Sequence, residues 1–218
     1  MDELDRREES EMGRPPRPLL TRDGIMAAAL ALVDEEGAEA LSTTRLAARL
    51  GVKGPSLYNY VSSRAEIVDG ISELMVAEMD LDPTVRPWAA ALDSWARAYR
   101  ATFAAHPNMV PLLVARPAQS AAAFQGYANT FAVLREAGWP EDQMAPVVQC
   151  LEYFLVGAAL DFGAPRVTSL PPEGLPPGLD ALLNAPPNLG ELAFEIGLTA
   201  LIHGFEETLN RLRPGRPA

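Results

Sequence analysis

Residues 41–61 read LSTTRLAARLGVKGPSLYNYV, and this stretch decides the fold of the N-terminal part of the chain. It predicts two short helices that are separated by a brief glycine-containing turn. Ser42 can cap the first helix, and Gly51 ends it after about two turns. Gly54 can cap the second helix, and Pro55 suits its first position, where the missing N–H of proline costs no hydrogen bond.

The second of these helices, over residues 55–60, has one face for the core and one for solvent. Leu57 and Val61 are four residues apart and share the inward face. The opposite face carries polar and aromatic side chains, namely Lys53, Ser56, Tyr58, Asn59 and Tyr60. Such a pair of helices is typical of a helix-turn-helix, which lays its second helix in the major groove of DNA.

The charge distribution supports DNA contact through this stretch alone. The chain has 29 acidic and 18 basic residues and a formal net charge of −11, which argues against a surface that coats nucleic acid or anionic membrane as a whole. The stretch that begins at Leu41 nevertheless contains no acid up to Arg64, and its other basic residues are Arg45, Arg49 and Lys53. A small helical bundle with a solvated basic face is the alternative interpretation.

The rest of the sequence continues the helical pattern, and no segment alternates as a strand does. We therefore predict an all-α fold, with an N-terminal helix-turn-helix three-helix domain, a long connecting helix and a C-terminal helical domain. Ser63 and Glu66 have the spacing of a capping box that opens the connecting helix. Asp82-Pro83 ends it, because proline disfavours a helical conformation in the residue before it.

Three parts are expected along the chain. Residues 1–20 form a flexible arm, since their charged and proline-rich composition cannot bury enough surface to order itself. Residues 21–81 form the helix-turn-helix DNA-binding domain, and residues 82–218 form a second helical domain. Its helices are predicted at about 87–106, 118–137, 141–162 and 189–212. The proline-rich segment 163–187 fits either a pocket lid or a passive connector.

The composition excludes several functional classes. Cys150 is the single cysteine, so neither an internal disulfide nor a Cys/His zinc site is expected, and the setting is predicted to be reducing and cytoplasmic. No apolar run reaches the ~18 uncharged residues that a membrane span requires. A nucleophile elbow, a glycine-rich phosphate loop and a two-histidine metal motif are missing, so no enzyme, cofactor or metal site is predicted.

The stretch 41–61 strongly resembles the DNA-binding signature of the TetR family of bacterial repressors. The downstream chain is similar to the tetracycline-repressor branch of that family, through LREAG at 134–138, VGAALD at 156–161 and ALIHGFE at 200–206. The resemblance covers about residues 20–212. It implies that residues 82–218 are a ligand-binding and dimerisation domain, that two chains bind a palindromic double-stranded DNA operator as a homodimer, and that a small-molecule effector releases the DNA.

The resemblance also implies roles for individual residues at the DNA. Thr43 and Thr44 would lie near phosphate and the groove edge, and Arg64 near a phosphate at the start of its helix. Lys53, Gly54, Pro55 and Ser56 would form the base-facing end of the recognition helix, beside Asn59. Tyr58 and Tyr60 would clamp phosphates, although packing of at least one of them within the bundle is an alternative. Gly54 stands where the tetracycline branch has a base-reading amide, which predicts a different operator sequence.

Aromatic side chains recur at helical spacing in the second domain, as in Trp88, Trp95, Tyr99 and Phe103. Such stripes are ordinarily core, and the resemblance implies that part of them encloses a ligand. The candidate ligand-binding residues are Trp95, Tyr99, Leu112, Arg116, Phe131, Val148, Tyr153 and Asp161.

The nature of the effector is constrained by two positions. Leu112 stands where the family has its metal-ligating histidine, which argues against magnesium-tetracycline, and only Asp161 matches the carboxylate position. We predict an apolar or aromatic ligand with a polar or cationic group near Tyr153 or Asp161. Glu152 is nine residues from Asp161, so the two do not share a tight face, and Glu152 is free to point to solvent. His106 is interpreted as a helix C-terminal cap.

The last helix carries more apolar surface than one flank of a monomer needs, which favours a dimer interface. The alternative is that it only closes the monomer core. The leading hypothesis is therefore a ligand-responsive homodimeric repressor without contact to membranes. A ligand-independent regulator, either an activator or constitutive, is the alternative, and an enzyme is the competing class.

Overall fold

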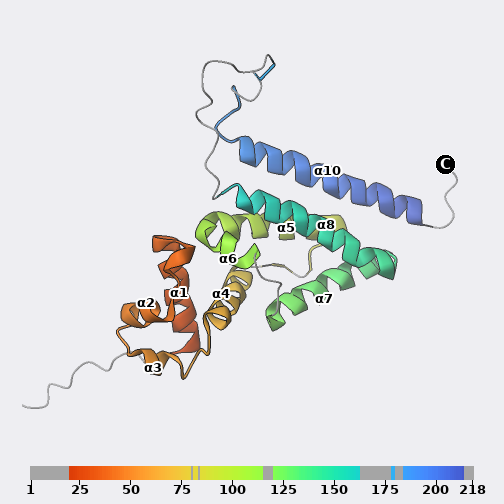
Figure 1. Ribbon diagram of the computed structural model, residues 1–218. Helices are drawn as coiled ribbons and strands as arrows, with labels where there is room; N and C mark the ends of the chain where they lie inside the picture. Colours follow the sequence, from red (N-terminus) through yellow and green to blue (C-terminus); the bar gives the residue numbers. More distant parts are fainter. Residues whose placement is uncertain are drawn as a thin grey trace, which may run out of the picture.

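The computed structural model describes residues 20–79, 81–82, 84–114, 120–162, 178–179 and 184–213, and every regular element in these ranges is a helix. The elements are α1 (Arg22–Glu36), η1 (Ala38–Ala40), α2 (Thr43–Arg49), α3 (Gly54–Leu57), α4 (Arg64–Glu78), α5 (Trp88–Ala105), η2 (Pro107–Met109), α6 (Val110–Val114), α7 (Ala121–Glu136), α8 (Glu141–Leu160) and α10 (Leu189–Leu212), as Figure 1 shows. The all-α prediction is confirmed.

The predicted helix starts in the N-terminal part are confirmed by their caps. The Thr21 hydroxyl accepts from the N–H of Gly24, Ser42 accepts from Arg45, and Ser63 accepts from Glu66. The recognition helix is shorter than the predicted 55–60, because α3 ends at Leu57 and residues 58–60 continue as a turn. The short α6 was not predicted.

The core of the N-terminal domain is built by α1 and α4, with α2 and α3 packed against them. Ile25, Leu46, Leu57, Ile67 and Ile71 are completely buried in it. Each lies on the inward face of its helix, so burial of apolar side chains fixes where the outward face of the helix-turn-helix lies.

This core continues beyond residue 82. Phe103, Met109, Val110 and Leu112 belong to the same buried cluster. The end of α5, η2 and α6 therefore pack directly on the N-terminal helices. The flexible arm predicted for 1–20 falls outside the described residues except for Leu20, and the segment 163–187 is described only at 178–179 and 184–187.

Polar contacts strengthen this junction. Asn108 Nδ2 donates to the carbonyls of Val33 (3.2 Å) and Asp34 (3.0 Å) at the end of α1. The ring of His106 lies between two carboxylates, with Nδ1 2.8 Å from Asp34 Oδ2 and Nε2 3.3 Å from Glu78 Oε2. The sequence interpretation of His106 as a helix cap is therefore incomplete, because its ring joins α5 to both α1 and α4.

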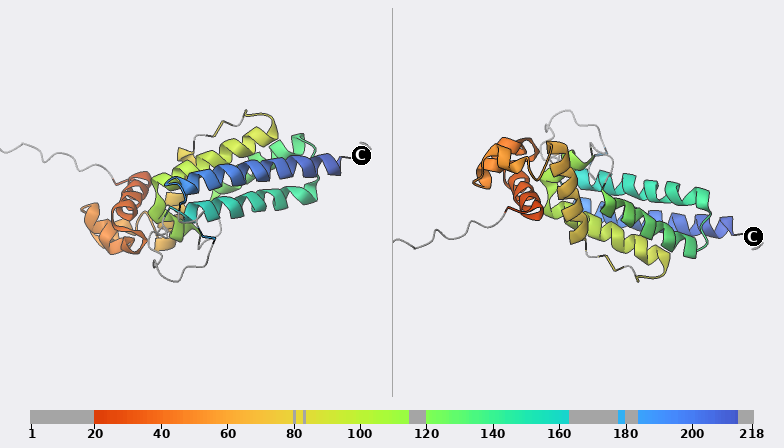
Figure 2. Two further views of the ribbon diagram at one scale, coloured as in Figure 1. Left: turned by 90° about the horizontal axis from the view of Figure 1, so that it is seen from above. Right: turned by 90° about the horizontal axis from the view of Figure 1, so that it is seen from below.

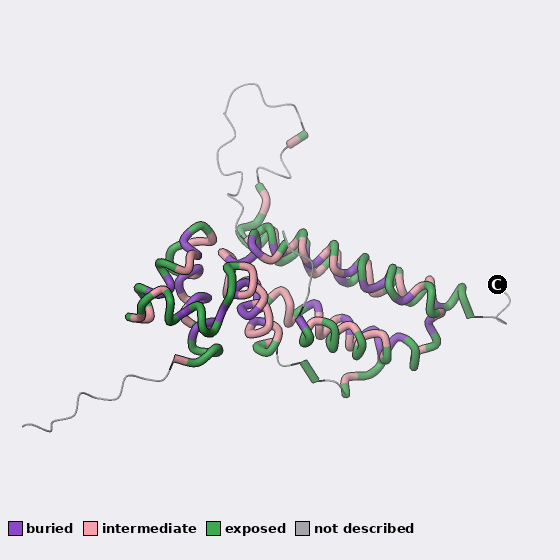
Figure 3. The backbone as a smooth tube through the Cα atoms, turned by 60° about the horizontal axis from the view of Figure 1, so that its bottom comes forward, coloured by how far each residue is buried: buried purple, intermediate pink, exposed green. Residues whose placement is uncertain are grey.

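The C-terminal domain is a bundle in which α5, α8 and α10 run side by side, with the N-terminal helices at one end (Figure 2). Trp88, Leu92, Leu151, Leu155 and Leu198 form part of its buried cluster. α10 is buried on the side that faces the bundle and exposed on the other (Figure 3). The helix α10 therefore closes the monomer core and also leaves apolar side chains exposed, whereas its predicted role in a dimer stays a prediction.

α8 is the one helix among the described residues whose length and hydropathy would allow a membrane span. It packs against α5, α7, α10 and α6, and it carries Glu152 near its middle. These are the properties of the central helix of a helical bundle.

Candidate DNA interface and ligand cavity

The recognition helix α3 is anchored by its apolar side chains and displays its polar ones. Leu57 and Val61 are buried, whereas Tyr58 and Tyr60 are 56% and 40% exposed. Lys53 lies at the N-cap of α3 and is exposed, as are Pro55, Ser56 and Asn59. Packing in the core therefore explains neither tyrosine, and the predicted outward face is present.

The turn between α2 and α3 depends on glycine. Gly51 has a φ of +65°, a left-handed conformation that glycine adopts without the penalty of a side chain. Across this turn the Tyr58 hydroxyl lies 3.3 Å from Thr43 Oγ1. This contact holds the phenol of α3 beside the first turn of α2, next to the exposed Thr44, so that hydroxyl groups of both helices gather at one end of the motif.

The basic residues of this stretch are less free than the sequence suggests. Arg49 forms a bidentate pair with Glu35 at 2.6 and 2.7 Å, and Arg45 pairs with Glu36. Both acids come from α1, outside the acid-free stretch. The Lys53 side chain makes no hydrogen bond or ion pair with any described residue, so it is the freest of these cations.

Arg64 ties α4 to the helix-turn-helix. Its Nε donates to the carbonyl of Leu41 at 2.9 Å, and Nη2 donates to that of Ala38 at 3.3 Å. The residue predicted to hold a phosphate thus also positions the loop that leads into α2.

The capping box at the start of α4 differs by one residue from the predicted form. Glu66 Oε2 accepts from the N–H of Ser62 at 2.7 Å and from its hydroxyl at 2.8 Å, instead of from Ser63. These hydrogen bonds to Ser62 lower the pKa of the Glu66 carboxyl. The side chains of Ser63 and Glu66 thus accept hydrogen bonds from backbone N–H groups on either side of the start of α4.

A cavity of about 900 Å³ lies between α4 and the helices of the second domain, and its wall includes residues of α4, α5, α6, α7 and α8. The helices α4, α5, α7 and α8 each contribute a stripe of side chains. The stripes of two of them are Val68, Ser72 and Met75 on α4, and Trp95, Tyr99 and Phe103 on α5. The cavity therefore reaches the helix that Arg64 connects to the DNA-binding motif.

Three of the predicted ligand-binding residues, Trp95, Tyr99 and Tyr153, lie in the wall of this cavity. Leu112, Phe131, Val148 and Asp161 do not. Leu112 is buried in the N-terminal core, and Val148 is 2% exposed on the inner face of α8. Arg116 falls outside the described residues.

Phe131 and Asp161, the other two predicted residues outside the cavity wall, each contact another residue of the C-terminal domain. The Phe131 ring stacks on Tyr127, with centroids 6.4 Å apart. Asp161 follows the last turn of α8. Its Oδ2 would lie 2.4 Å from a Cβ atom added at Gly190. The carboxylate therefore lies against the start of α10.

The polar group of the cavity that sequence reasoning missed is Glu152. Its Oε1 accepts from the Tyr127 hydroxyl at 2.5 Å, and its Oε2 accepts from Gln149 Nε2 at 3.3 Å. The prediction that Glu152 points to solvent is wrong, because the residue is half-buried in the cavity wall. Gln149, Glu152, Tyr153 and Val156 share one face of α8, and this spacing is the signal that could have found it.

Burial and the Glu152 carboxylate raise the pKa of two neighbouring tyrosine hydroxyls. Burial, and secondarily the charge of Glu152, raises the pKa of Tyr99 to about 12. Burial raises the pKa of Tyr127 as well, and its hydrogen bond to Glu152 adds to the shift. Both phenols are neutral at physiological pH and can donate a hydrogen bond.

Comparison with known proteins places both halves of the chain in one family. Residues 25–71 match the family of bacterial regulatory proteins called the tetR family, and residues 82–169 match the tetracyclin repressor-like C-terminal domain. The chain belongs to the TetR family.

Individual TetR-family relatives match over different lengths. The HTH-type transcriptional repressor DrrR1 of Streptomyces coeruleorubidus is 32% identical over 148 residues, which are 67% of this chain and 55% of that protein. The chain thus spans about half the length of this relative. The tetracycline repressor protein class E of Escherichia coli is 26% identical over 88% of this chain and 93% of its own length.

Among solved TetR-family structures, apo ActR from Streptomyces coelicolor superimposes with a TM-score of 0.76 at 26% identity, over 89% of this chain and 98% of ActR. The complex of ActR with actinorhodin has a TM-score of 0.72 at the same identity, over 87% of this chain. The architecture described above is therefore that of a whole TetR-family subunit.

The described part of this TetR-family chain holds no group of three or more His, Cys, Asp or Glu residues that could bind a metal ion. Leu112, which the sequence resemblance places at the family's metal-ligating histidine, is 9% exposed, and its side chain has no atom that could bind a metal. The donor set therefore does not fit a divalent cation at that position.

Proposed function

We propose that this TetR-family chain is a cytoplasmic, ligand-responsive transcriptional repressor. It binds a palindromic operator as a homodimer and leaves the operator when a small molecule occupies the 900 Å³ cavity. The proposal assigns the chain no catalysis.

The observation that carries this proposal is that α4 belongs to both sites. Val68, Ser72 and Met75 of α4 line the cavity, while Arg64 in its first turn holds the loop before α2. A ligand that binds one position of α4 more tightly than another shifts the population of both sites together. In a dimer this changes the separation of two recognition helices that must match successive major grooves ~34 Å apart.

The contacts of His106 and Asn108 with α1 support the same coupling. They join the second domain to the end of α1, whereas α4 itself forms part of the cavity wall. The two main helices of the DNA-binding core are therefore each attached to the ligand-binding domain. A displacement of one relative to the other would tilt the helix-turn-helix.

At the DNA, we assign base reading to the exposed end of α3. The Lys53 ammonium can donate to guanine, and the Ser56 hydroxyl can bond several base edges, whereas Gly54 and Pro55 permit close approach of the backbone. The phosphate contacts are assigned to Thr43, Thr44, Tyr58, Tyr60 and Arg64, with Asn59 beside them. This division follows the general rule that phosphate contacts position and base contacts specify.

For the ligand, we assign Trp95, Tyr99 and Tyr153 to contact with an aromatic body. Three aromatic residues in one cavity wall can stack on flat rings and bury them from water. The relation to ActR, whose structure with actinorhodin is known, supports a small-molecule effector here.

The test is operator binding by a Lys53→Ala variant. We expect about tenfold weaker binding to the intergenic DNA beside the gene, and a salt slope reduced by about one, because one phosphate- or base-directed cation is lost. The measurement is an electrophoretic mobility shift at two salt concentrations.

Arg49→Ala is the matched control for this test. It removes the same charge from the same motif, but Arg49 is already paired with Glu35. Equal losses for the two variants would contradict the assignment of α3 as the recognition helix. No binding by the wild-type chain at any salt concentration would contradict the proposed function itself.

A further inference from the structure

Glu152 is an unusual group for a cavity whose wall is largely apolar and aromatic. It lies in the middle of α8, on the stripe that faces the cavity. In the part of the chain that the structure describes, no Arg, Lys or His forms an ion pair with it. A half-buried carboxylate without a cation loses hydration that its neighbours do not fully replace.

The two hydrogen bonds that Glu152 accepts leave it with binding capacity. A carboxylate has about four lone-pair sites, and Tyr127 and Gln149 occupy one on each oxygen. Both partners are neutral donors, so they orient the carboxylate without cancelling its charge. At least one further donor can reach it from the cavity.

None of the other charged residues in the described wall neutralises Glu152 through an ion pair. Besides Glu152 the described wall contains Asp69, Asp82 and Arg86. The guanidinium of Arg86 is directed at Glu136 on α7, with Nε and Nη2 at 3.1 and 2.9 Å from Oε2. The one cation among the described wall residues is therefore paired with a carboxylate other than Glu152.

Two tyrosine rings lie near the carboxylate. Tyr99 and Tyr127 are close enough to Glu152 for its charge to perturb both phenols, and Trp95 is one turn away from Tyr99 on α5. Aromatic faces attract cations as well as flat rings. The same site can thus hold an aromatic body and an attached positive charge.

We infer that the cavity takes an aromatic ligand bearing a protonated amine, which Glu152 binds while Tyr127 and Gln149 hold the carboxylate in place. This inference rests on the proposed function and specifies the chemical class of its effector. It moves the polar group of the ligand from Tyr153 or Asp161, as the sequence suggested, to Glu152.

The test compares two fluorescent probes with the same rings, 9-(methylaminomethyl)anthracene, which is a cation at pH 7.5, and 9-anthracenemethanol, which is neutral. Binding to the full-length protein is measured by fluorescence without DNA. We expect the amine to bind the wild type about tenfold more tightly than the alcohol, the margin expected of one charge-assisted hydrogen bond.

Glu152→Gln should remove this preference and leave the affinity for the alcohol within about twofold, because glutamine keeps the shape and loses the charge. Glu141→Gln is the matched control, since Glu141 lies on the same helix, outside the cavity wall, and pairs with Arg135. It should leave both affinities unchanged. Operator binding and urea unfolding of each variant report whether the fold is intact.

Equal affinities of the wild type for the two probes would overturn the inference, and so would an equal loss of both in Glu152→Gln. Failure of either probe to bind would overturn it as well. In each of these cases the proposed repressor function is judged separately, by the mobility shift of the unliganded protein on its operator.

Discussion

At the scale of single residues, Gly197 shows how closely α10 approaches α8. A Cβ added at this position would lie 2.4 Å from Cε2 of Phe154. The Phe154 ring cannot move away freely, because it stacks on Phe194 with centroids 5.4 Å apart. Alanine at position 197 must therefore displace a packed aromatic pair.

We predict that Gly197→Ala lowers the free energy of unfolding by about 1–3 kcal/mol, the usual cost of overpacking a core. The matched control is Gly126→Ala in α7, where a Cβ meets no atom within 4 Å. Alanine there should stabilise the helix by up to about 1 kcal/mol. Urea unfolding followed by circular dichroism measures both, and a neutral Gly197→Ala would show that the two helices can separate.

The sequence predicted some site residues well and others poorly, and the difference has a physical cause. Lys53 and Tyr58 are exposed because Leu57 faces the core and they lie on other sides of the same short helical segment. The sequence of that segment alone is enough to predict this. Glu35, which pairs with Arg49, and Tyr127, which donates to Glu152, lie on other helices, α1 and α7. Their distances depend on how helices far apart in sequence pack, which periodicity does not contain.

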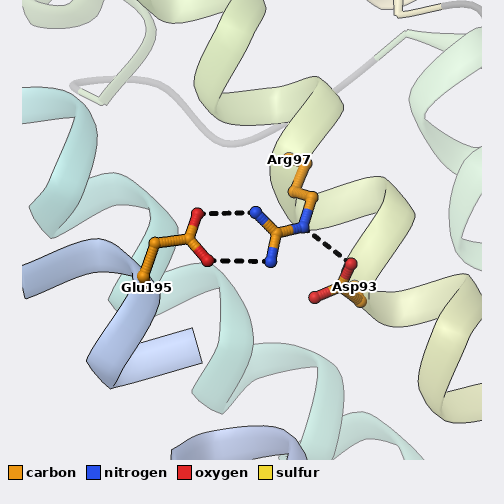
Figure 4. A network of polar contacts seen from close by, with 3 residues as sticks. All are labelled: Asp93, Arg97 and Glu195. Carbon is orange, nitrogen blue, oxygen red and sulfur yellow. Dashed lines mark hydrogen bonds and ion pairs between the residues drawn. The ribbon is translucent and has the colours of Figure 1, made fainter. Parts of the chain in front are cut away.

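At the scale of elements, one polar network fastens α5 to α10. Arg97 binds Glu195 with both Nη atoms, at 2.6 and 2.9 Å, and binds Asp93 through Nε at 2.8 Å (Figure 4). Hydrogen bonding to the Arg97 guanidinium lowers the pKa of the Glu195 carboxyl. A carboxyl whose pKa is lowered by folding stabilises the fold above its unfolded pKa, and this contribution disappears as the pH falls through the folded value.

We therefore predict that Glu195→Gln lowers the urea midpoint at pH 7, and that the difference from wild type shrinks at pH 3. These two values lie on either side of the isoelectric point near 4.7, where precipitation would interfere. Glu207→Gln is the control, because Glu207 is an exposed carboxyl of the same helix that pairs with no described residue. A difference from wild type that is equally large at both pH values would refute the electrostatic explanation.

Most helices could be located from sequence because their ends are coded locally. Thr21, Ser42 and Ser63 each cap a helix with the side chain that predicted it. α6 could not be predicted, since Val110–Val114 is too short to show a helical period and is held in place by the cluster around Met109. The end of α3 at Leu57 is marked by no residue in the sequence, and the N–H groups of Tyr58 and Tyr60 donate there to the carbonyls of Gly54 and Leu57.

At the scale of the whole molecule, the subunit has an apolar face that its own core does not need. Leu189, Leu192 and Ile196 on α10 are 44%, 43% and 72% exposed, and Leu160 on α8 is 47% exposed. Phe194, Leu198 and Leu209 on the other side of α10 are buried in the monomer. An apolar face of this kind on a monomer marks an interface, and we assign it to the homodimer.

We predict that Ile196→Glu converts the dimer into a monomer, because each copy would bury an unpaired carboxylate at the two-fold interface, where the same patch meets itself. Phe124→Glu is the control, since Phe124 is also a large exposed apolar residue, at 58%, but lies on α7. Light scattering coupled to gel filtration reports the mass. The Ile196→Glu monomer should retain the helical circular dichroism of the wild type but lose most of its operator affinity, because one subunit reaches only one half-site. A variant that stays dimeric would place the interface elsewhere, whereas a monomer with full affinity would refute two-fold recognition of the operator.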